Sequence, residues 1–188
     1  RAPAEEALFQ ARRKAASVAA QFSGAVLIGS DTLISLDGAK IGKPKDADDA
    51  RDILRRMRGC THEVVTAACM LESPPPFPSP LEGEGDGGGA IGKCFEWVET
   101  ARVRMREFSD PELEAYLATG DSLDKAGAYS VQGLGRSLIA GLEGDYLAVM
   151  GLPLRAVAVG LRELGCPVPV DVDRLYEERN FLNWRTFD

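Results

Sequence analysis

Apolar residues repeat every three or four positions in several segments of the chain, which is the spacing of one buried helix face. One segment covers 4–22, another follows Asp46 and ends before Gly59, and a third begins at Pro153. Aspartate is a favoured helix N-cap, and glycine is typical just past a helix end. A shorter helix is predicted after Ser109, where Ser-Asp-Pro-Glu forms a capping box with proline in the first turn.

Short apolar runs and alternating patterns predict strands. From 95 to 106 apolar and polar residues alternate, which predicts a long half-buried strand that pairs with the apolar run 64–71 as an antiparallel ribbon. Asp37-Gly38 is a strong hairpin signal. Helices and strands mix along the chain, so the class is α/β or α+β with a central sheet. The predicted strands cover residues 25–28, 32–36, 64–71, 95–106, 137–142 and 146–150.

Residues 73–91 interrupt these patterns with prolines, glycines and acidic residues. Such a composition buries too little apolar surface to offset the entropy of ordering, so we predict a flexible insertion within a hairpin. We expect residues 1–166 to form a single domain. The tail of 167–188 holds aromatic residues without a clear period, and we expect it either to wrap the surface or to fray.

Composition places the chain among ordinary globular proteins, with 188 residues, 45% hydrophobic and 27% charged. The 22 Lys and Arg against 29 Asp and Glu give a net charge of −7, which argues against broad binding to nucleic acid. No apolar run approaches the roughly 20 residues that span a bilayer, and no signal peptide is recognisable. We therefore expect a cytoplasmic protein that binds no membrane.

Cysteine spacing gives no sign of a metal site or a disulfide framework. There is no Cys-x-x-Cys pair, so the sequence favours reduced core thiols, and this agrees with a cytoplasmic setting. The cysteines are Cys60, Cys69, Cys94 and Cys166.

Three polar, glycine-containing stretches lie next to apolar strands. In Gly-Ser-Asp-Thr at 29–32, Asp31 can bind a metal, take a proton from water, or only make a turn. An aspartyl nucleophile of the haloacid-dehalogenase type would require a second acid two residues on, where Leu33 stands. In the second stretch, Lys43 precedes a stiffening proline and can meet a phosphate or remain a solvated loop lysine. The full P-loop spacing is absent.

The third stretch, 124–133, contains a charge pair, two glycines and Gln132. The Gln132 amide can read a base edge, because it both donates and accepts, or it can cap a backbone group in a structural turn. The only histidine, His62, follows a predicted helix end and is interpreted as structural rather than catalytic.

Taken in order, these stretches resemble the Maf family of nucleoside-triphosphate pyrophosphatases. Each motif is weak alone, and their order and spacing carry the resemblance from about residue 11 to residue 164. The matching motifs lie at 11–15, 28–32, 42–44, 59–64, 124–133, 143–146 and 149–154.

The resemblance implies an α/β fold like that of inosine-triphosphate pyrophosphatases, with a mixed twisted sheet, flanking helices and a cleft between two lobes. It implies hydrolysis of a nucleoside triphosphate to monophosphate and pyrophosphate with Mg²⁺ or Mn²⁺, by a homodimer. Asp31 matches the proton acceptor and a metal position, and Lys14 and Lys43 match lysines near the phosphates. Thr32 and Gln132 match positions that tune base choice, and the Asp-Thr pair favours dTTP and UTP, with modified pyrimidine nucleotides as further substrates.

The family pattern also has an N-terminal strand and a Ser/Arg-rich phosphate loop, which would precede Arg1. Two alternatives to the dTTP/UTP activity stay open from the sequence. One is a non-catalytic nucleotide-binding or regulatory protein of septum formation. The other is a pyrophosphatase for other non-canonical nucleotides.

Overall fold

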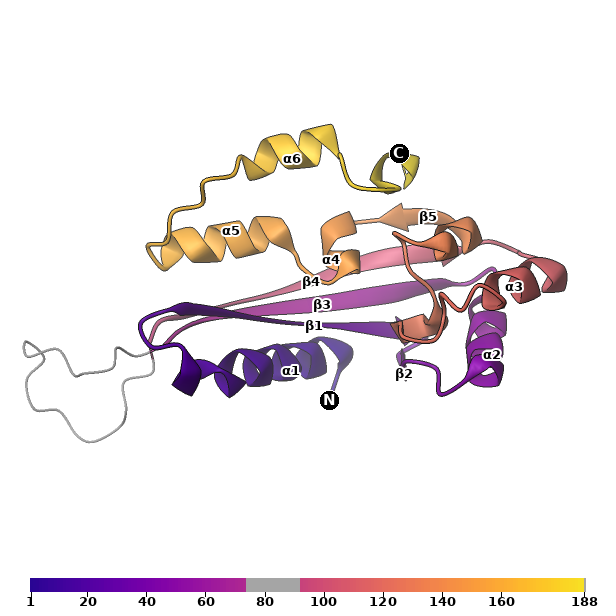
Figure 1. The fold of residues 1–188 in the computed structure, drawn as a ribbon, viewed down its shortest axis with the longest axis horizontal. Coiled ribbons are helices and arrows are strands. Elements are labelled where there is room, and N and C mark those ends of the chain that lie inside the picture. The colour runs from indigo at the N-terminus through magenta and orange to yellow at the C-terminus, as the bar shows by residue number, and fades with distance from the viewer. Residues whose placement is uncertain (74–91, 188) are drawn as a thin grey trace, which may run out of the picture.

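The computed structural model describes residues 1–73 and 92–187, and the insertion predicted over 73–91 lies almost wholly outside them. One sheet has the strand order β2-β1-β3-β4-β5, and helices cover its faces (Figure 1). This confirms the helix-flanked α/β fold. Where the resemblance implied a mixed sheet, the strand pairs of the described residues are antiparallel. The strands are β1 (Val26–Leu36), β2 (Ala39–Ile41), β3 (Thr61–Glu72), β4 (Cys94–Met105) and β5 (Ile139–Glu143).

The long strands β1, β3 and β4 form the body of the sheet. The two short runs predicted at 25–28 and 32–36 belong to one strand, β1, because the polar residues between them keep the extended backbone. Asp37 and Gly38 both have positive φ, at 52° and 79°, and turn the chain into β2 as the dipeptide predicts. The ribbon of β3 and β4 predicted across the insertion is confirmed.

Helix α1 (Pro3–Ser17) lies along one face of the sheet (Figure 1). Its buried stripe consists of alanines, which pack on β1 and β3. Small side chains allow close approach, and Gly29 of β1 makes it closer still, because a Cβ there would lie 2.1 Å from the Ala11 carbonyl oxygen. The helix and the strand are therefore nearly in backbone contact at this point.

The remaining helices cover the other face and one end of the sheet (Figure 1). The larger core cluster lies among α2, α3 and the ends of β1, β3 and β4, and Val157 of α5 packs on Met70 of β3. The Asp46 side chain accepts a hydrogen bond from the Asp49 N–H at 2.8 Å, which confirms the predicted N-cap. These helices are α2 (Ala47–Met57), α3 (Asp110–Leu117), α4 (Tyr146–Met150), α5 (Leu154–Glu163) and α6 (Val172–Glu178).

Two strand predictions are wrong in whole or in part. Residues 146–150 form the helix α4, because the Asp145 side chain accepts hydrogen bonds from the N–H groups of Leu147 and Ala148 and Gly151 ends the helix at φ 118°. These caps outweigh the strand-like run of apolar residues. Residues 134–138 form a 3₁₀ helix, and only from Ile139 onward is the segment a strand.

The C-terminal tail packs on the body of the protein, as one of the two expected outcomes. Asp171 caps α6, and the buried Trp184 ring stacks on the Tyr146 ring with 5.2 Å between centroids. The Tyr146 hydroxyl donates a hydrogen bond to the Leu182 carbonyl. Residues after α5 thus extend the core, although they show no hydrophobic period of their own.

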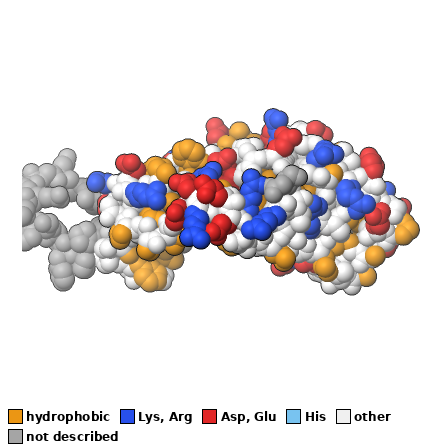
Figure 2. Space-filling model, turned by 90° about the horizontal axis from the view of Figure 1, so that it is seen from above, with side chains coloured by type: hydrophobic (Ala, Val, Ile, Leu, Met, Phe, Trp, Pro, Cys, Tyr) orange, Lys and Arg blue, Asp and Glu red, His pale blue; other side chains and the backbone are white. Residues whose placement is uncertain are grey.

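On the face that carries α6, basic and acidic side chains are intermingled and form no continuous basic stripe (Figure 2). Within residues 1–73 and 92–187, no helix is both long and apolar enough to cross a bilayer.

Candidate functional site

The predicted acid and one predicted lysine are in direct contact. The Lys14 ammonium, on the last turn of α1, donates to Asp31 Oδ1 and to the Ser30 carbonyl oxygen, each at 2.7 Å. The Asp31 side chain is 17% exposed and that of Lys14 is 56% exposed. Because Gly29 brings α1 onto β1 just before Ser30, the close packing of helix and strand sets this contact.

Thr32 is the next residue of β1, so its side chain points to the opposite face of the sheet. There it lines a pocket of about 230 Å³ together with Gln132, Lys125 and residues of α4. The structure therefore brings Asp31 to Lys14 and Thr32 to Gln132, with the backbone of β1 between the two pairs.

The Thr32 hydroxyl belongs to a chain of hydrogen bonds with a defined direction. The Thr66 hydroxyl lies 2.8 Å from the Ala148 carbonyl oxygen and 2.8 Å from Thr32 Oγ1. A carbonyl can only accept, so Thr66 gives its single proton to Ala148 and must accept from Thr32. Thr32 then has only lone pairs left to offer, and it presents a hydrogen-bond acceptor to the pocket.

Gln132 is exposed at the pocket, and its side chain has no hydrogen-bond partner among the described residues. The alternative that it caps a backbone group is not seen there. Its backbone is tied down by the tail, because the Asn183 amide donates to the carbonyl oxygens of Val131 and Gln132 at 3.1 and 3.0 Å. No sequence signal linked Asn183 to this loop, which lies about fifty positions away.

Lys43 is exposed on the segment that follows β2. Among the described residues it makes no ion pair or hydrogen bond to Asp31. The hydrogen bond from Lys125 lowers the pKa of Asp124, and the positive charge of Lys43 adds to this effect. The preceding Gly42 carbonyl accepts from the Gly127 N–H at 3.0 Å, so Lys43 lies beside the loop that carries Gln132.

Lys125 lines the pocket and was not singled out from the sequence. Its ammonium donates to Asp124 Oδ1 at 2.7 Å and to the Asp121 carbonyl oxygen at 2.8 Å, and it pairs with the Asp121 carboxylate at 3.1 Å. These contacts raise the pKa of Lys125, led by the hydrogen bond to Asp124. A fully paired lysine fixes the loop and leaves little charge for a ligand.

His62 is structural, as predicted, and supports the same pocket. It is 1% exposed, and its Nε2 shares a hydrogen bond with the hydroxyl of Tyr129, a lining residue, at 2.7 Å. Burial lowers the pKa of His62 to about 4. The folded protein therefore holds this ring neutral at pH 7.

A pH-dependent stability follows from this burial. The unfolded chain takes up a proton at His62 near pH 6.5 and the folded chain only near pH 4, so stability is complete above pH 6.5 and falls as the pH drops toward 4. Between pH 7.5 and 5 we expect this group alone to cost about 2 kcal/mol of unfolding free energy. Urea unfolding at both values should show that His62→Gln loses correspondingly less than the unaltered chain. An equal loss in both proteins would contradict the assignment.

Comparison with known proteins identifies the family of this chain. The family model described as Maf-like protein matches residues 1–164. The chain belongs to the Maf family. It is 40% identical over 154 residues to a protein named dTTP/UTP pyrophosphatase from Dictyoglomus turgidum, which covers 82% of this chain and 72% of the relative. A protein of the same name from Pyrococcus furiosus is 39% identical over 163 residues, with 87% and 76% covered.

Family membership confirms the resemblance seen in the sequence motifs. The match ends at residue 164, so the tail that carries Trp184 and Asn183 lies beyond it. In this member of the Maf family, residues outside the matched region pack against the loop that carries Gln132.

Proposed function

We propose that this Maf-family protein hydrolyses dTTP and UTP to the nucleoside monophosphate and pyrophosphate. The observation that carries the proposal is the contact of Asp31 with Lys14 at 2.7 Å, beside a pocket lined by Thr32 and Gln132. Relatives at 36–40% identity carry the name dTTP/UTP pyrophosphatase. The two alternatives from the sequence, a regulatory nucleotide-binding protein and a pyrophosphatase for other nucleotides, become outcomes of the test below.

Asp31 is assigned the role of proton acceptor for the attacking water. Lys14 occupies Oδ1, and no hydrogen bond to Oδ2 occurs among the described residues, so that oxygen can take the proton. Two of the three ammonium protons of Lys14 go to Ser30 and Asp31, and the third can reach a phosphate oxygen. Water attacks the α-phosphorus, and pyrophosphate leaves with part of its charge balanced by Lys14. We also assign Lys43 to the phosphates on the family resemblance, and because it lies beside the loop that carries Gln132, its ammonium would approach them from that side of β1.

The direction of the Thr32 hydrogen bond supports a thymine or uracil base. Both bases carry a proton on N3, whereas N3 of cytosine is an acceptor. An acceptor at Thr32 Oγ1 can bind the N3 proton of thymine or uracil, whereas it would face another acceptor at N3 of cytosine. The free Gln132 amide is available to donate to the O4 carbonyl.

A nucleotide that uses both pairs must pass around the backbone of β1. Of the described strands only β3 pairs with residues 30–32 of β1, since β2 pairs with Ile34 to Leu36. The opposite edge of β1 has no described strand beside these residues. We propose that the ribose crosses this edge, with the base on the Thr32 side and the phosphates on the Asp31 side.

A divalent cation fits the oxygen atoms at this position. Mg²⁺ and Mn²⁺ prefer carboxylate and carbonyl oxygens, and Mg²⁺ is commonly held by one or two carboxylates together with substrate phosphates. Lys14 holds the Ser30 carbonyl oxygen and Asp31 Oδ1, so the oxygen open to a cation here is Asp31 Oδ2. A cation bound there would neutralise phosphate charge as pyrophosphate departs.

A panel of nucleotides tests the proposal. The full chain is incubated with dTTP, UTP, dCTP, dATP, dGTP and ITP in Mg²⁺ or Mn²⁺, and pyrophosphate and inorganic phosphate are measured separately. Pyrophosphate released from dTTP and UTP first supports the proposal. Preference for a purine substrate would favour the other pyrophosphatase, and binding without turnover would favour the regulatory protein.

We further propose a homodimer in the cytoplasm, as the family resemblance implies.

Thr32→Val is expected to lower kcat/KM for dTTP and UTP by about 10- to 100-fold and to leave dCTP nearly unchanged. The valine keeps the shape of threonine but loses the acceptor for the N3 proton. Thr32→Ser is the matched control, because it keeps the hydroxyl and should retain the preference. Equal losses for dTTP and dCTP would contradict the role of Thr32 in reading the base.

A further inference from the structure

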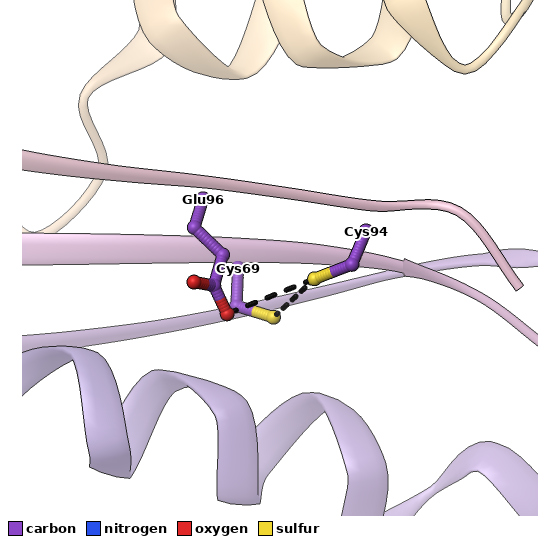
Figure 3. A group of neighbouring side chains, drawn as sticks. All are labelled: Cys69, Cys94 and Glu96. Carbon is purple, nitrogen blue, oxygen red and sulfur yellow. Dashed lines mark hydrogen bonds between the residues drawn. The ribbon is translucent and has the colours of Figure 1, made fainter. Parts of the chain in front are cut away.

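Two cysteines that are 25 positions apart in the sequence meet on the face of the sheet that α1 covers. Cys69 of β3 is 2% exposed, Cys94 of β4 is exposed, and Glu96 lies beside both (Figure 3). The sequence predicted reduced core thiols and no metal site. A core position is wrong for Cys94, whose free thiol lies at the surface.

The strand register explains why these side chains meet. Cys69 pairs with Glu96 across β3 and β4, and Cys94 pairs with Leu71, two positions along on the same face. Side chains two residues apart on a strand share a face, so all three point toward α1 (Figure 3). Pairing between distant strands therefore places two sulfurs and a carboxylate together without a local cysteine motif.

The separations match those of ligands on a tetrahedral zinc ion. The two sulfurs are 3.8 Å apart, Cys94 Sγ is 3.7 Å from Glu96 Oε1, and the three ligand atoms lie within 4.8 Å of one another. With zinc–sulfur and zinc–oxygen bonds of about 2.3 and 2.0 Å, a tetrahedral ion places two sulfurs about 3.8 Å apart and a sulfur and an oxygen about 3.5 Å apart. A disulfide would require the sulfurs to approach to about 2.05 Å.

Arg12 of α1 contacts the carboxylate of this group. Its guanidinium binds both carboxylate oxygens of Glu96, with Nη2 to Oε2 at 2.6 Å, and so fixes the orientation of the carboxylate. Metal-binding side chains are commonly oriented by such outer contacts. Two thiolates and one carboxylate carry three negative charges, which a divalent ion and Arg12 balance.

We propose that Cys69, Cys94 and Glu96 bind one Zn²⁺ ion, or a similar thiophilic divalent ion, with a fourth position open to water. Binding breaks two S–H bonds, forms two zinc–thiolate bonds and releases two protons to solvent. The ion joins β3 to β4 near the end of the ribbon where residues 73–93 connect them. Asp31 is not one of these three groups. Binding changes the oxidation state of neither zinc nor sulfur.

Cobalt spectroscopy tests the site without reference to activity. The reduced full chain, stripped of metal with a chelator, is titrated with Co²⁺. We expect one equivalent to give the intense near-ultraviolet absorption of thiolate-to-cobalt charge transfer, and Zn²⁺ to abolish it. Cobalt at Asp31 would give no such absorption, because that position offers only oxygen ligands. An unchanged near-ultraviolet spectrum would overturn the proposal.

Single substitutions assign the ligands. Cys94→Ser and Glu96→Gln should weaken zinc affinity at least tenfold, measured by competition with a chromophoric chelator, and Cys94→Ser should remove part of the charge-transfer absorption. Cys94 is exposed, so its replacement should leave the circular dichroism spectrum unchanged. Cys166→Ser is the matched control and should bind zinc as the unaltered chain does. Equal affinity in Cys94→Ser, or a reduced chain that binds no zinc and forms a Cys69–Cys94 disulfide on mild oxidation, would overturn the assignment.

Discussion

Asp31→Asn is expected to lower kcat for pyrophosphate release from dTTP by about 10²- to 10⁴-fold, the usual contribution of a positioned proton acceptor. Asparagine keeps the size of the side chain, and its carbonyl can still accept the hydrogen bond from Lys14. It cannot take a proton from water. Steady-state kinetics with dTTP and UTP measure the loss, and the thermal unfolding midpoint shows whether the fold is kept.

Asp37→Asn is the matched control for this substitution. Asp37 lies in the exposed turn just after the same strand, with φ 52°, a conformation that asparagine tolerates well. We expect its turnover to equal that of the unaltered chain. If Asp31→Asn kept full kcat while Asp37→Asn behaved as expected, Asp31 would have no role as proton acceptor.

Gly29→Ala is expected to weaken both folding and turnover. The added Cβ would lie 2.1 Å from the Ala11 oxygen and 2.6 Å from the Ala15 nitrogen, and both are backbone atoms that cannot rotate away. Helix α1 must therefore move, which we expect to cost about 1–3 kcal/mol or more. Because Lys14 lies between these two alanines, the same movement separates its ammonium from Asp31.

Calorimetry and kinetics check this prediction together. For a chain of this size, each kcal/mol lowers the unfolding midpoint by about 2–4 °C. Gly141→Ala is the control, because its Cβ would meet only the tip of Arg104 at 3.4 Å, and both midpoint and kcat should stay near those of the unaltered chain. A Gly29→Ala protein with unchanged midpoint and turnover would show that α1 can shift freely on β1.

Much of the fold could be predicted where the signal is local. The cap at Asp46 and the alternation along 95–106 each gave an element that the structure contains. The strand predicted at 146–150 was wrong because an apolar run does not distinguish a buried strand from a short buried helix. The N-cap at Asp145 and the C-cap at Gly151 are the signals that distinguish this helix from a strand.

The site was predictable only in part, because some of its contacts join segments that are far apart in the sequence. The Asp31 and Lys14 motifs pointed to one place, and the structure joins them. The hold of Asn183 on the Gln132 loop and the meeting of Cys69 with Cys94 depend on contacts between distant segments. No spacing within the sequence encodes them.

Asp31 and Thr32 are consecutive residues of β1, so the register of β1 against β3 decides which face of the sheet each side chain reaches. A slip by a single residue would turn Asp31 toward the pocket that Thr32 now lines and Thr32 toward α1, which would exchange the two roles we propose for them. The uninterrupted ladder from Val26 to Ser35 against β3 guards against this. A change in chain length is harmless only where it leaves that ladder untouched, and the residues between Glu72 and Cys94 lie past its end.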